Sequence, residues 1–287
     1  MTAIAADAPV AYSPGAVARA GFAVSDAFAM ARRNVLRIAR APDQVVFTLI
    51  SPIMFTLLFR YVFGGAVGNG LGSATSYATY LIPGIAVQTA LFSAGTTGFA
   101  LADDLQKGFV DRLRSLPMAR SAVLSGRLLS DTLNNTVQVL ILVGVGFAVG
   151  FRPKSAWGLI VGLVLILLFA TAISMVYALV GMSVSTVEAV NAATFPIVFP
   201  LTFASSAFVP VNTMPGWLQG FAYHQPVSIV INSVRSLTLG DISPQARQAL
   251  FDGLGTGTLV WQAIAWTAGL GAIFGWLAVR KYKNLSR

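Results

Sequence analysis

The sequence predicts an all-helical integral membrane protein. Of its 287 residues, 56% are hydrophobic and only 10% are charged, and the mean hydropathy is +0.74. Soluble domains carry about 25% charged residues, so this chain cannot cover an ordinary solvated surface. Its apolar residues fall in runs of roughly 20 residues, the length that a helix needs to cross about 30 Å of hydrocarbon. Barrel strands need only about ten alternating residues, so these continuous runs indicate helices.

Six of the apolar runs are predicted to cross the membrane. The first begins after Pro42 and ends at Gly64 and Gly65, and the fifth contains Pro196 and Pro200 and is expected to be kinked. The predicted spans are 45–63, 80–102, 133–151, 157–180, 190–209 and 259–279.

Residues 214–239, between the last two spans, are apolar but are divided by His224, Gln225 and Pro226. Each piece is too short to cross the bilayer. We therefore expect two re-entrant half-helices that enter and leave the membrane on its outer side, a geometry that is tolerated where protein buries the turn.

The N-terminal region is expected to lie outside the spans. Residues 1–15 are rich in Ala and Pro and are predicted to be a flexible tail. Residues 16–41 alternate apolar and basic residues, which is typical of an amphipathic helix at the headgroup boundary. A disordered juxtamembrane segment is the alternative. Residues 280–287 form a second basic tail.

The basic residues predict the orientation of the chain. With both termini in the cytoplasm, 14 of the 19 Lys and Arg residues lie on the cytoplasmic side, as the positive-inside rule requires. The net charge of +9 is then explained by membrane topology and lipid contact, with no need for nucleic acid. We expect a multi-pass protein of the cell membrane, typical of a bacterial inner membrane.

The connection between the second and third spans carries a short amphipathic pattern at residues 104–117. Asp103 and Lys107 are spaced for an ion pair within one helix, and Pro117 ends the pattern. Such a helix is suited to a groove on a soluble partner, although a solvated loop is the alternative. Its apolar stripe consists of Leu105, Phe109, Leu113 and Leu116.

Polar residues inside the predicted spans are candidates for a transport pathway. The alternative is interhelical hydrogen bonding, which contributes about 0.6 kcal/mol on average in membrane bundles. The candidates are Gln88, Thr89, Thr96, Thr97, Asn134, Asn135, Gln138, Thr202, Ser205 and Ser206.

Several short motifs occur in a characteristic order: Tyr80-Leu81-Ile82-Pro83-Gly84, the segment from Asp104 to Pro117, Gly126-Arg127-Leu128 with Asp131, and Gln225-Pro226-Val227. At these spacings the chain resembles the ABC-2 type export permeases from about residue 30 onward, and most closely their daunorubicin-resistance (DrrB-like) group. The resemblance implies the permease subunit of an ATP-driven exporter that moves a drug, antibiotic or lipid out of the cell. Export of a lipid-linked polysaccharide or another glycoconjugate is the alternative.

The resemblance also implies partners. Residues 104–117 would be a coupling helix received by a separate ATPase subunit, 16–41 a connecting helix, and 214–239 an outer cap. A second permease, identical or related, would complete the assembly. No G-x-x-x-x-G-K-[ST] motif occurs in the sequence, so ATP and Mg²⁺ are expected on the partner and no cofactor or catalytic residue in this chain. The residues implied in ATPase coupling are Asp104, Leu105, Gly108, Phe109, Asp111, Arg112, Leu113, Arg114 and Pro117.

Two other classes of protein fit the sequence less well. An intramembrane enzyme would need convergent catalytic groups, and the best pair that the sequence offers is His224 with Ser228. An ion-driven transporter normally uses an acidic residue within the membrane, and no Asp or Glu falls at the middle of a predicted span.

Overall fold

The computed structural model describes residues 42–65, 76–108 and 120–284, and all regular elements within these ranges are helices. The predicted tail at 1–15 and the predicted amphipathic helix at 16–41 lie outside the described residues.

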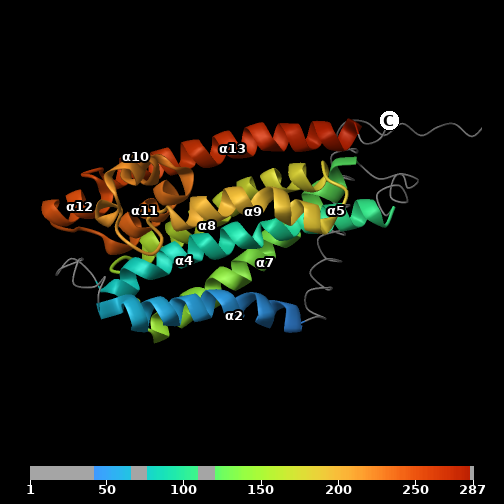
Figure 1. Ribbon diagram of the computed structural model, residues 1–287. Helices are drawn as coiled ribbons and strands as arrows, with labels where there is room; N and C mark the ends of the chain where they lie inside the picture. The colour runs from blue at the N-terminus through green and yellow to red at the C-terminus, as the bar shows by residue number, and fades with distance from the viewer. Residues whose placement is uncertain (1–41, 66–75, 109–119, 285–287) are drawn as a thin grey trace, which may run out of the picture.

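The longer helices run side by side and alternate in direction along the chain (Figure 1). Residues 42 and 284 lie at one end of the bundle, which we call the terminal end. The helices are α2 (Pro42–Leu58) with its π-helical continuation η1 (Phe59–Phe63), α4 (Tyr77–Ser93) with α5 (Gly95–Gln106), α7 (Arg120–Ala148), α8 (Ala156–Gly181), α9 (Val187–Phe203) and α13 (Thr256–Asn284).

The opposite end, which we call the cap end, carries four short helices between α9 and α13 (Figure 1). They are η2 (Val211–Thr213), α10 (Gly216–His224), α11 (Pro226–Leu239) and α12 (Pro244–Phe251). Proline begins α11, where its missing N–H has no helical partner to lose, and Gln225 separates α11 from α10. The predicted break at His224-Gln225-Pro226 is therefore confirmed, while the position of these helices in a membrane stays a prediction. The sequence analysis missed α12.

Four stretches are long and apolar enough to cross a membrane: Tyr77–Gln106, Gly126–Ala148, Ala156–Gly181 and Pro244–Tyr282. Thr48–Phe63 and Val187–Phe203 are shorter apolar helices. Large apolar side chains also point outward from the bundle, among them Leu133, Val137, Leu140, Ile160, Val164 and Leu168. In water such a surface would be unfavourable, and in a bilayer it contacts lipid.

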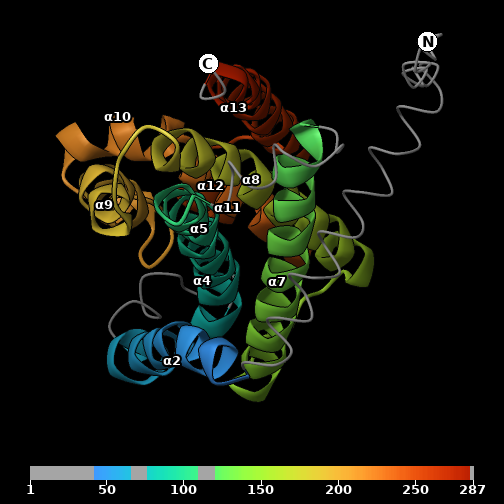
Figure 2. The ribbon, with the colours of Figure 1, turned by 90° about the vertical axis from the view of Figure 1, so that its right-hand side faces the viewer.

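Helix α4 forms the centre of the molecule. Nearly all of its side chains are buried. Figure 2 shows α2 and α7 beside it, and α8 and α11 also contact it. Gly84 allows one of these close approaches, because a Cβ atom at this position would overlap the backbone carbonyl of Ala207. The chain that follows α9 can therefore pack directly on α4.

Several helices begin or end away from the boundaries of the predicted spans, which themselves stay predictions. Helix α8 matches the predicted span 157–180 closely, but α7 begins at Arg120, well before the predicted start at 133. Within this extension, the charged side chains of Arg127 and Asp131 pair with each other on the helix. The helix α13 likewise continues to Asn284, into the predicted basic tail.

Helix α9 ends at Phe203, before the end of the fifth predicted span at 209. Side chains satisfy the backbone groups that the helix leaves unpaired. The amide nitrogen of Gln225 donates to the carbonyls of Leu201 and Ala204, at 2.8 and 3.2 Å. The hydroxyl of Ser205 donates to the carbonyl of Thr202 and accepts from the N–H of Ala207. These bonds stabilise a non-helical turn in place of a further helical one.

Candidate translocation groove and its polar neighbours

A groove of about 300 Å³ lies between α2, α4 and α9. Small-molecule sites are typically about 300 to 1,000 Å³, mostly apolar, with a few polar groups that fix orientation. This groove has that composition. Its aromatic residues are Phe55, Phe92, Phe195, Phe199 and Phe203, and its other lining residues are Thr48, Ser51, Pro52, Gln88, Thr89, Ser93, Thr96 and Gln138.

One wall of the groove is a row of phenylalanines on α9. Phe195, Phe199 and Phe203 are spaced four residues apart, so their rings lie on one face of the helix. Their centroids are 5.1 and 4.3 Å apart, and each side chain is 38–50% exposed. The row continues through Phe208 to Phe59 in η1, whose ring centroids are 4.3 Å apart. The groove therefore presents the aromatic side chains of Phe195, Phe199 and Phe203 to any occupant.

The polar lining comes mainly from α4 and α2, and α7 contributes Gln138. The side-chain nitrogen of Gln138 donates to the hydroxyl of Ser93 at 3.1 Å. Its side-chain oxygen is buried and has no hydrogen-bond partner. A buried polar atom without a partner is uncommon and costs free energy, so it often marks a position where a ligand or water binds. The groove thus contains one hydrogen-bond acceptor available to an occupant.

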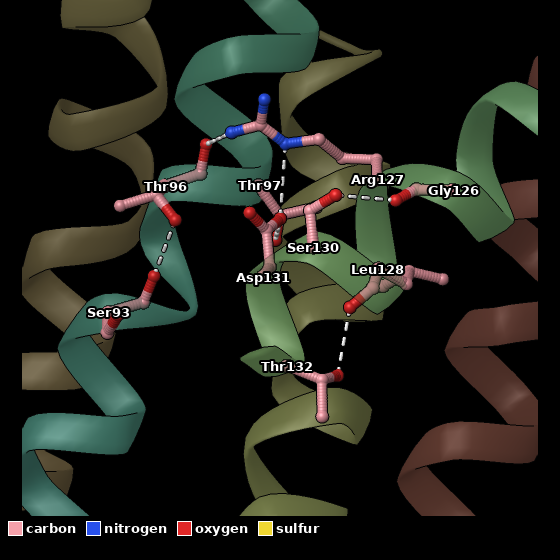
Figure 3. A network of polar contacts seen from close by, with 9 residues as sticks. All are labelled: Ser93, Thr96, Thr97, Gly126, Arg127, Leu128, Ser130, Asp131 and Thr132. Carbon is pink, nitrogen blue, oxygen red and sulfur yellow. Dashed lines mark hydrogen bonds and ion pairs between the residues drawn. The ribbon is translucent and has the colours of Figure 1, made fainter. Parts of the chain in front are cut away.

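Beside the groove, α5 and α7 share a buried polar network (Figure 3). The Nε of Arg127 is 3.2 Å from the Oδ2 of Asp131, one turn further along α7. The hydroxyl of Thr97 donates to the same Oδ2 at 2.5 Å, and the Nη2 of Arg127 donates to the carbonyl of Thr96 at 3.2 Å. The side chains of Arg127 and Asp131 are only 19% and 6% exposed.

Asp131 lies inside the apolar stretch Gly126–Ala148, whereas the sequence analysis placed it in a connection between spans. The predicted spans leave Arg127 and Asp131 in the charged connection before residue 133. Nothing in the sequence shows that the hydroxyl of Thr97 hydrogen-bonds the carboxylate of Asp131.

The structure brings four of the predicted pathway residues together in the groove: Gln88, Thr89, Thr96 and Gln138. The other predicted residues lie elsewhere. Thr97 bonds Asp131, and Thr202 and Ser205 bond carbonyls of their own segment. Ser206 bonds Asn232 on α11. Asn135 is buried and its side-chain oxygen has no partner, while Asn134 is half-buried. A role in transport stays a prediction for each of them.

Sequence reasoning missed the aromatic wall. The signal was present, because Phe195, Phe199 and Phe203 recur at intervals of four within one predicted span. It was not decisive, because an apolar row on a membrane helix is equally typical of a lipid-facing surface. Only the packing of α2 and α4 beside α9 turns this row into a groove wall.

Of the residues predicted to couple the chain to an ATPase, the structure describes Asp104, Leu105 and Gly108, which lie where α5 ends, at the terminal end. The helix predicted over 104–117 does not begin at 104, because Asp104, Leu105 and Gln106 complete α5. Lys107 and Gly108 then form a turn, and Gly108 has a left-handed φ of 62° that ends the helix. Phe109, Asp111, Arg112, Leu113, Arg114 and Pro117 lie outside the described residues.

Two contacts fix the end of α5. The predicted ion pair between Asp103 and Lys107 is confirmed, with a distance of 2.7 Å. The side chain of Gln106 donates to the carbonyl of Ser185 at 2.6 Å, in the connection between α8 and α9.

The side chains of His224 and Ser228 do not form a catalytic pair. The Nδ1 of His224 contacts the carbonyl of Gly220 in its own helix, and the hydroxyl of Ser228 accepts from the N–H of Ser206. Among the described residues, no group of three or more His, Cys, Asp or Glu side chains is placed to hold a metal ion.

Comparison with known proteins gives consistent similarities. The family model described as "ABC-2 type transporter" matches residues 26–239. The daunorubicin resistance ABC transporter permease protein DrrB1 of Streptomyces coeruleorubidus is 32% identical over 253 residues, which is 88% of this chain and 84% of that protein. The probable doxorubicin resistance ABC transporter permease protein DrrC of Mycobacterium tuberculosis is 28% identical over 87% of each chain. A putative transport permease, ycf38, of Porphyra purpurea is 27% identical over 72% of each.

Proposed function

Because this chain belongs to the ABC-2 type transporter family, and is thus the membrane permease of an ABC exporter, we propose that it moves a flat, amphipathic drug-like compound out of the cell. The compound would pass through the groove between α2, α4 and α9. The multi-pass plasma-membrane location follows from the family and from the apolar helices, whereas the cargo and its route are our proposal.

The aromatic wall is the observation that carries this choice of cargo. Half-exposed rings on α9 favour stacking with planar apolar molecules. The lining contains no charged side chain, and its polar groups are hydroxyls and amides that suit a few hydrogen bonds. Two relatives are named for resistance to daunorubicin or doxorubicin. A glycan, which carries many hydroxyls, would find too few partners in this lining, so the glycoconjugate alternative is less favoured.

Six membrane crossings fit the alternating helices, with both termini in the cytoplasm. Residues 42–63 of α2 and η1 would span about 33 Å at 1.5 Å per residue, and the 17 residues of α9 about 25 Å. The terminal end, where residues 42, 106, 120 and 284 lie, would then face the cytoplasm. This orientation agrees with the predominance of basic residues there.

The energy for transport would come from a separate ATPase subunit that binds residues 104–117. The turn at Lys107 and Gly108 ends α5, so with this orientation the segment would begin at the cytoplasmic face. A second permease copy would cover the open side of the groove, where Phe92 and Phe195 are 39% and 50% exposed. Such a copy would also enclose the cargo between two aromatic walls.

Inverted membrane vesicles that contain this chain and its ATPase test the proposal. We expect ATP-dependent, vanadate-sensitive uptake of doxorubicin, because inside-out vesicles accumulate an exported compound. The double variant F199A/F203A removes two rings of the wall and should lower uptake about tenfold or more. The matched control is Phe147→Ala, since Phe147 is 40% exposed on α7 and does not line the groove.

Two results would contradict the proposal. Doxorubicin uptake that does not require ATP would exclude an ABC export mechanism for this compound. Equal uptake by F199A/F203A and by the wild type, at equal protein levels, would exclude the aromatic wall as the binding surface.

A further inference from the structure

The ion pair between Arg127 and Asp131 is unusual because it is buried in a part of the chain that contacts lipid. Burying charged groups in a membrane protein costs several kcal/mol unless they are paired and hydrogen-bonded. The two residues lie one turn apart on α7, so they can neutralise each other without any contact with α5. Both side chains nevertheless also bond α5 (Figure 3).

The contacts across the helix interface are specific. Asp131 accepts from the hydroxyl of Thr97 at 2.5 Å, and Arg127 donates to the carbonyl of Thr96 at 3.2 Å. The bonded oxygen of Asp131 therefore receives hydrogen bonds from both helices, and so Asp131 links them. We call Thr97, Arg127 and Asp131 the α5–α7 tie.

The tie lies at an informative place along the chain. Thr96 and Thr97 are in the first turn of α5, which follows α4 after the single residue Ala94. Ala94 keeps a right-handed helical conformation and its N–H donates to the carbonyl of Ala90, so α4 and α5 form one continuous stretch. From there α5 continues to Gln106, and α7 begins at Arg120. The tie thus joins the two helices that flank residues 107–119.

The tie is also continuous with the groove. The hydroxyl of Thr96 donates to the carbonyl of Ser93 at 2.8 Å, and the hydroxyl of Ser93 accepts from Gln138 at 3.1 Å. Thr96, Ser93 and Gln138 all line the groove. The residues Arg127, Thr96, Ser93 and Gln138 are thus joined in pairs by hydrogen bonds, from the tie to the groove wall.

We propose that Thr97, Arg127 and Asp131 are positioning residues that make α5 and α7 move as one body, so that a displacement of residues 107–119 reaches the groove wall. Without the tie, α5 can move without carrying along α7 and the groove residue Gln138 on it. The inference rests on the proposed function, in which the segment 104–117 receives the work of the ATPase.

Neutral variants of the tie test this role. We expect Asp131→Asn, Thr97→Val and the double variant R127Q/D131N to lower doxorubicin uptake per ATP hydrolysed by ~tenfold, which is within the usual range of coupling between sites. Doxorubicin binding to the purified complex and the ATPase rate should stay within about twofold of the wild type, because the groove and the partner are intact. The double variant leaves no unpaired charge, so it separates lost coupling from misfolding.

Matched controls exist in the same chain. Arg152→Gln changes an exposed arginine that bonds carbonyls of its own segment at the cap end, and Thr136→Val changes a threonine that bonds only the carbonyl one turn back. Both should transport normally. Normal uptake per ATP in R127Q/D131N would overturn the inference, and so would a loss of uptake fully explained by weaker drug binding.

A crosslink provides the decisive test, because the natural sequence contains no cysteine. In T97C/D131C the tie is lost and coupling should fail under reducing conditions. A short thiol crosslinker that joins the two cysteines should restore uptake per ATP, since α5 and α7 are again one body. If the crosslinked protein is correctly folded and binds doxorubicin but does not transport it, the two helices must separate during the cycle and the inference is wrong.

The double variant F109A/R112A distinguishes this inference from the proposed function. If F109A/R112A exports normally, the assignment of 104–117 to the ATPase is wrong. If F109A/R112A is inactive while the tie variants export normally, only the α5–α7 tie is wrong.

Discussion

The guanidinium carbon of Arg235 lies 3.5 Å from the ring centroid of Tyr80. Arg235 is fully buried, and its described hydrogen-bond acceptors are the carbonyls of Tyr80 and Ala207, at 2.7 and 2.9 Å, and the side-chain oxygen of Asn232. One side chain on α11 therefore fixes both α4 and the turn after α9. The hydroxyl of Tyr80 in turn donates to the carbonyl of Ser206, in the same turn.

Substitution of Arg235 should destabilise the cap end strongly. In Arg235→Met, the carbonyls of Tyr80 and Ala207 lose a charged donor, and we expect a loss of about 2–4 kcal/mol in stability. Arg235→Lys keeps the charge but cannot reach several acceptors in a fixed fork, so its loss should be intermediate. Thermal unfolding of the purified protein in detergent measures both. Arg152→Lys, at an exposed site, serves as the control. Equal melting temperatures for all of these variants would show that the contacts of Arg235 do not stabilise the cap end.

The sequence was sufficient for much of the helix arrangement but not for the ends of helices. Apolar length alone located α8 closely, and the prolines and polar residues near Gln225 located the break between α10 and α11. The start of α7 and the end of α9 depended on tertiary contacts. Asp131 needs Thr97 from α5, and the turn after α9 needs Gln225 and Arg235 from α11.

The sequence also predicted the residues of the groove only in part. Gln88, Thr89 and Gln138 were selected as polar residues within apolar spans, and they do line the groove. Thr202 and Ser205 meet the same criterion but do not line the groove. Their hydroxyls bond nearby backbone carbonyls, as the hydroxyl of Thr89 also does. Polarity within a span cannot distinguish these two uses, because threonine and serine satisfy themselves on the previous turn wherever they occur in a helix.

Gly84 should not tolerate a side chain. A Cβ atom there would overlap the carbonyl of Ala207, which is fixed by Arg235, so Gly84→Ala must push the turn after α9 away from α4. We expect a loss of about 1–3 kcal/mol from overpacking, although alanine normally favours a helix over glycine. Gly144→Ala in α7 is the matched control, since nothing lies within 4 Å of its added Cβ. Gly144→Ala should leave the melting temperature unchanged or raise it. An equal change in melting temperature for both variants would show that position 84 does not lie against the carbonyl of Ala207.

Gln138 should affect binding more than stability. Gln138→Met removes a hydrogen bond to Ser93 but also removes the buried oxygen that has no partner, so the two effects on stability nearly cancel, to within about 1 kcal/mol. If that oxygen accepts a hydrogen bond from cargo, doxorubicin binding should weaken about tenfold, since a lost hydrogen bond contributes roughly 1.4 kcal/mol. Fluorescence titration of the purified complex measures this. Gln219→Met at the cap end is the control, and unchanged doxorubicin affinity in Gln138→Met would show that the oxygen does not meet cargo.

Gly108 should be required for the end of α5 by its backbone conformation alone. Its φ of 62° is left-handed, yet no atom lies within 4 Å of an added Cβ. Gly108→Ala therefore meets strain without a clash, and we expect a loss of about 1–2 kcal/mol. Gly108→Asn should lose less, because asparagine adopts the left-handed conformation more readily. If the turn directs the following segment toward the ATPase, doxorubicin uptake per ATP hydrolysed should be highest with glycine at position 108. It should be lower with asparagine and lowest with alanine. A Gly108→Asn variant that is worse than Gly108→Ala in both melting temperature and uptake would show that side-chain size, and not the backbone angle, limits this position.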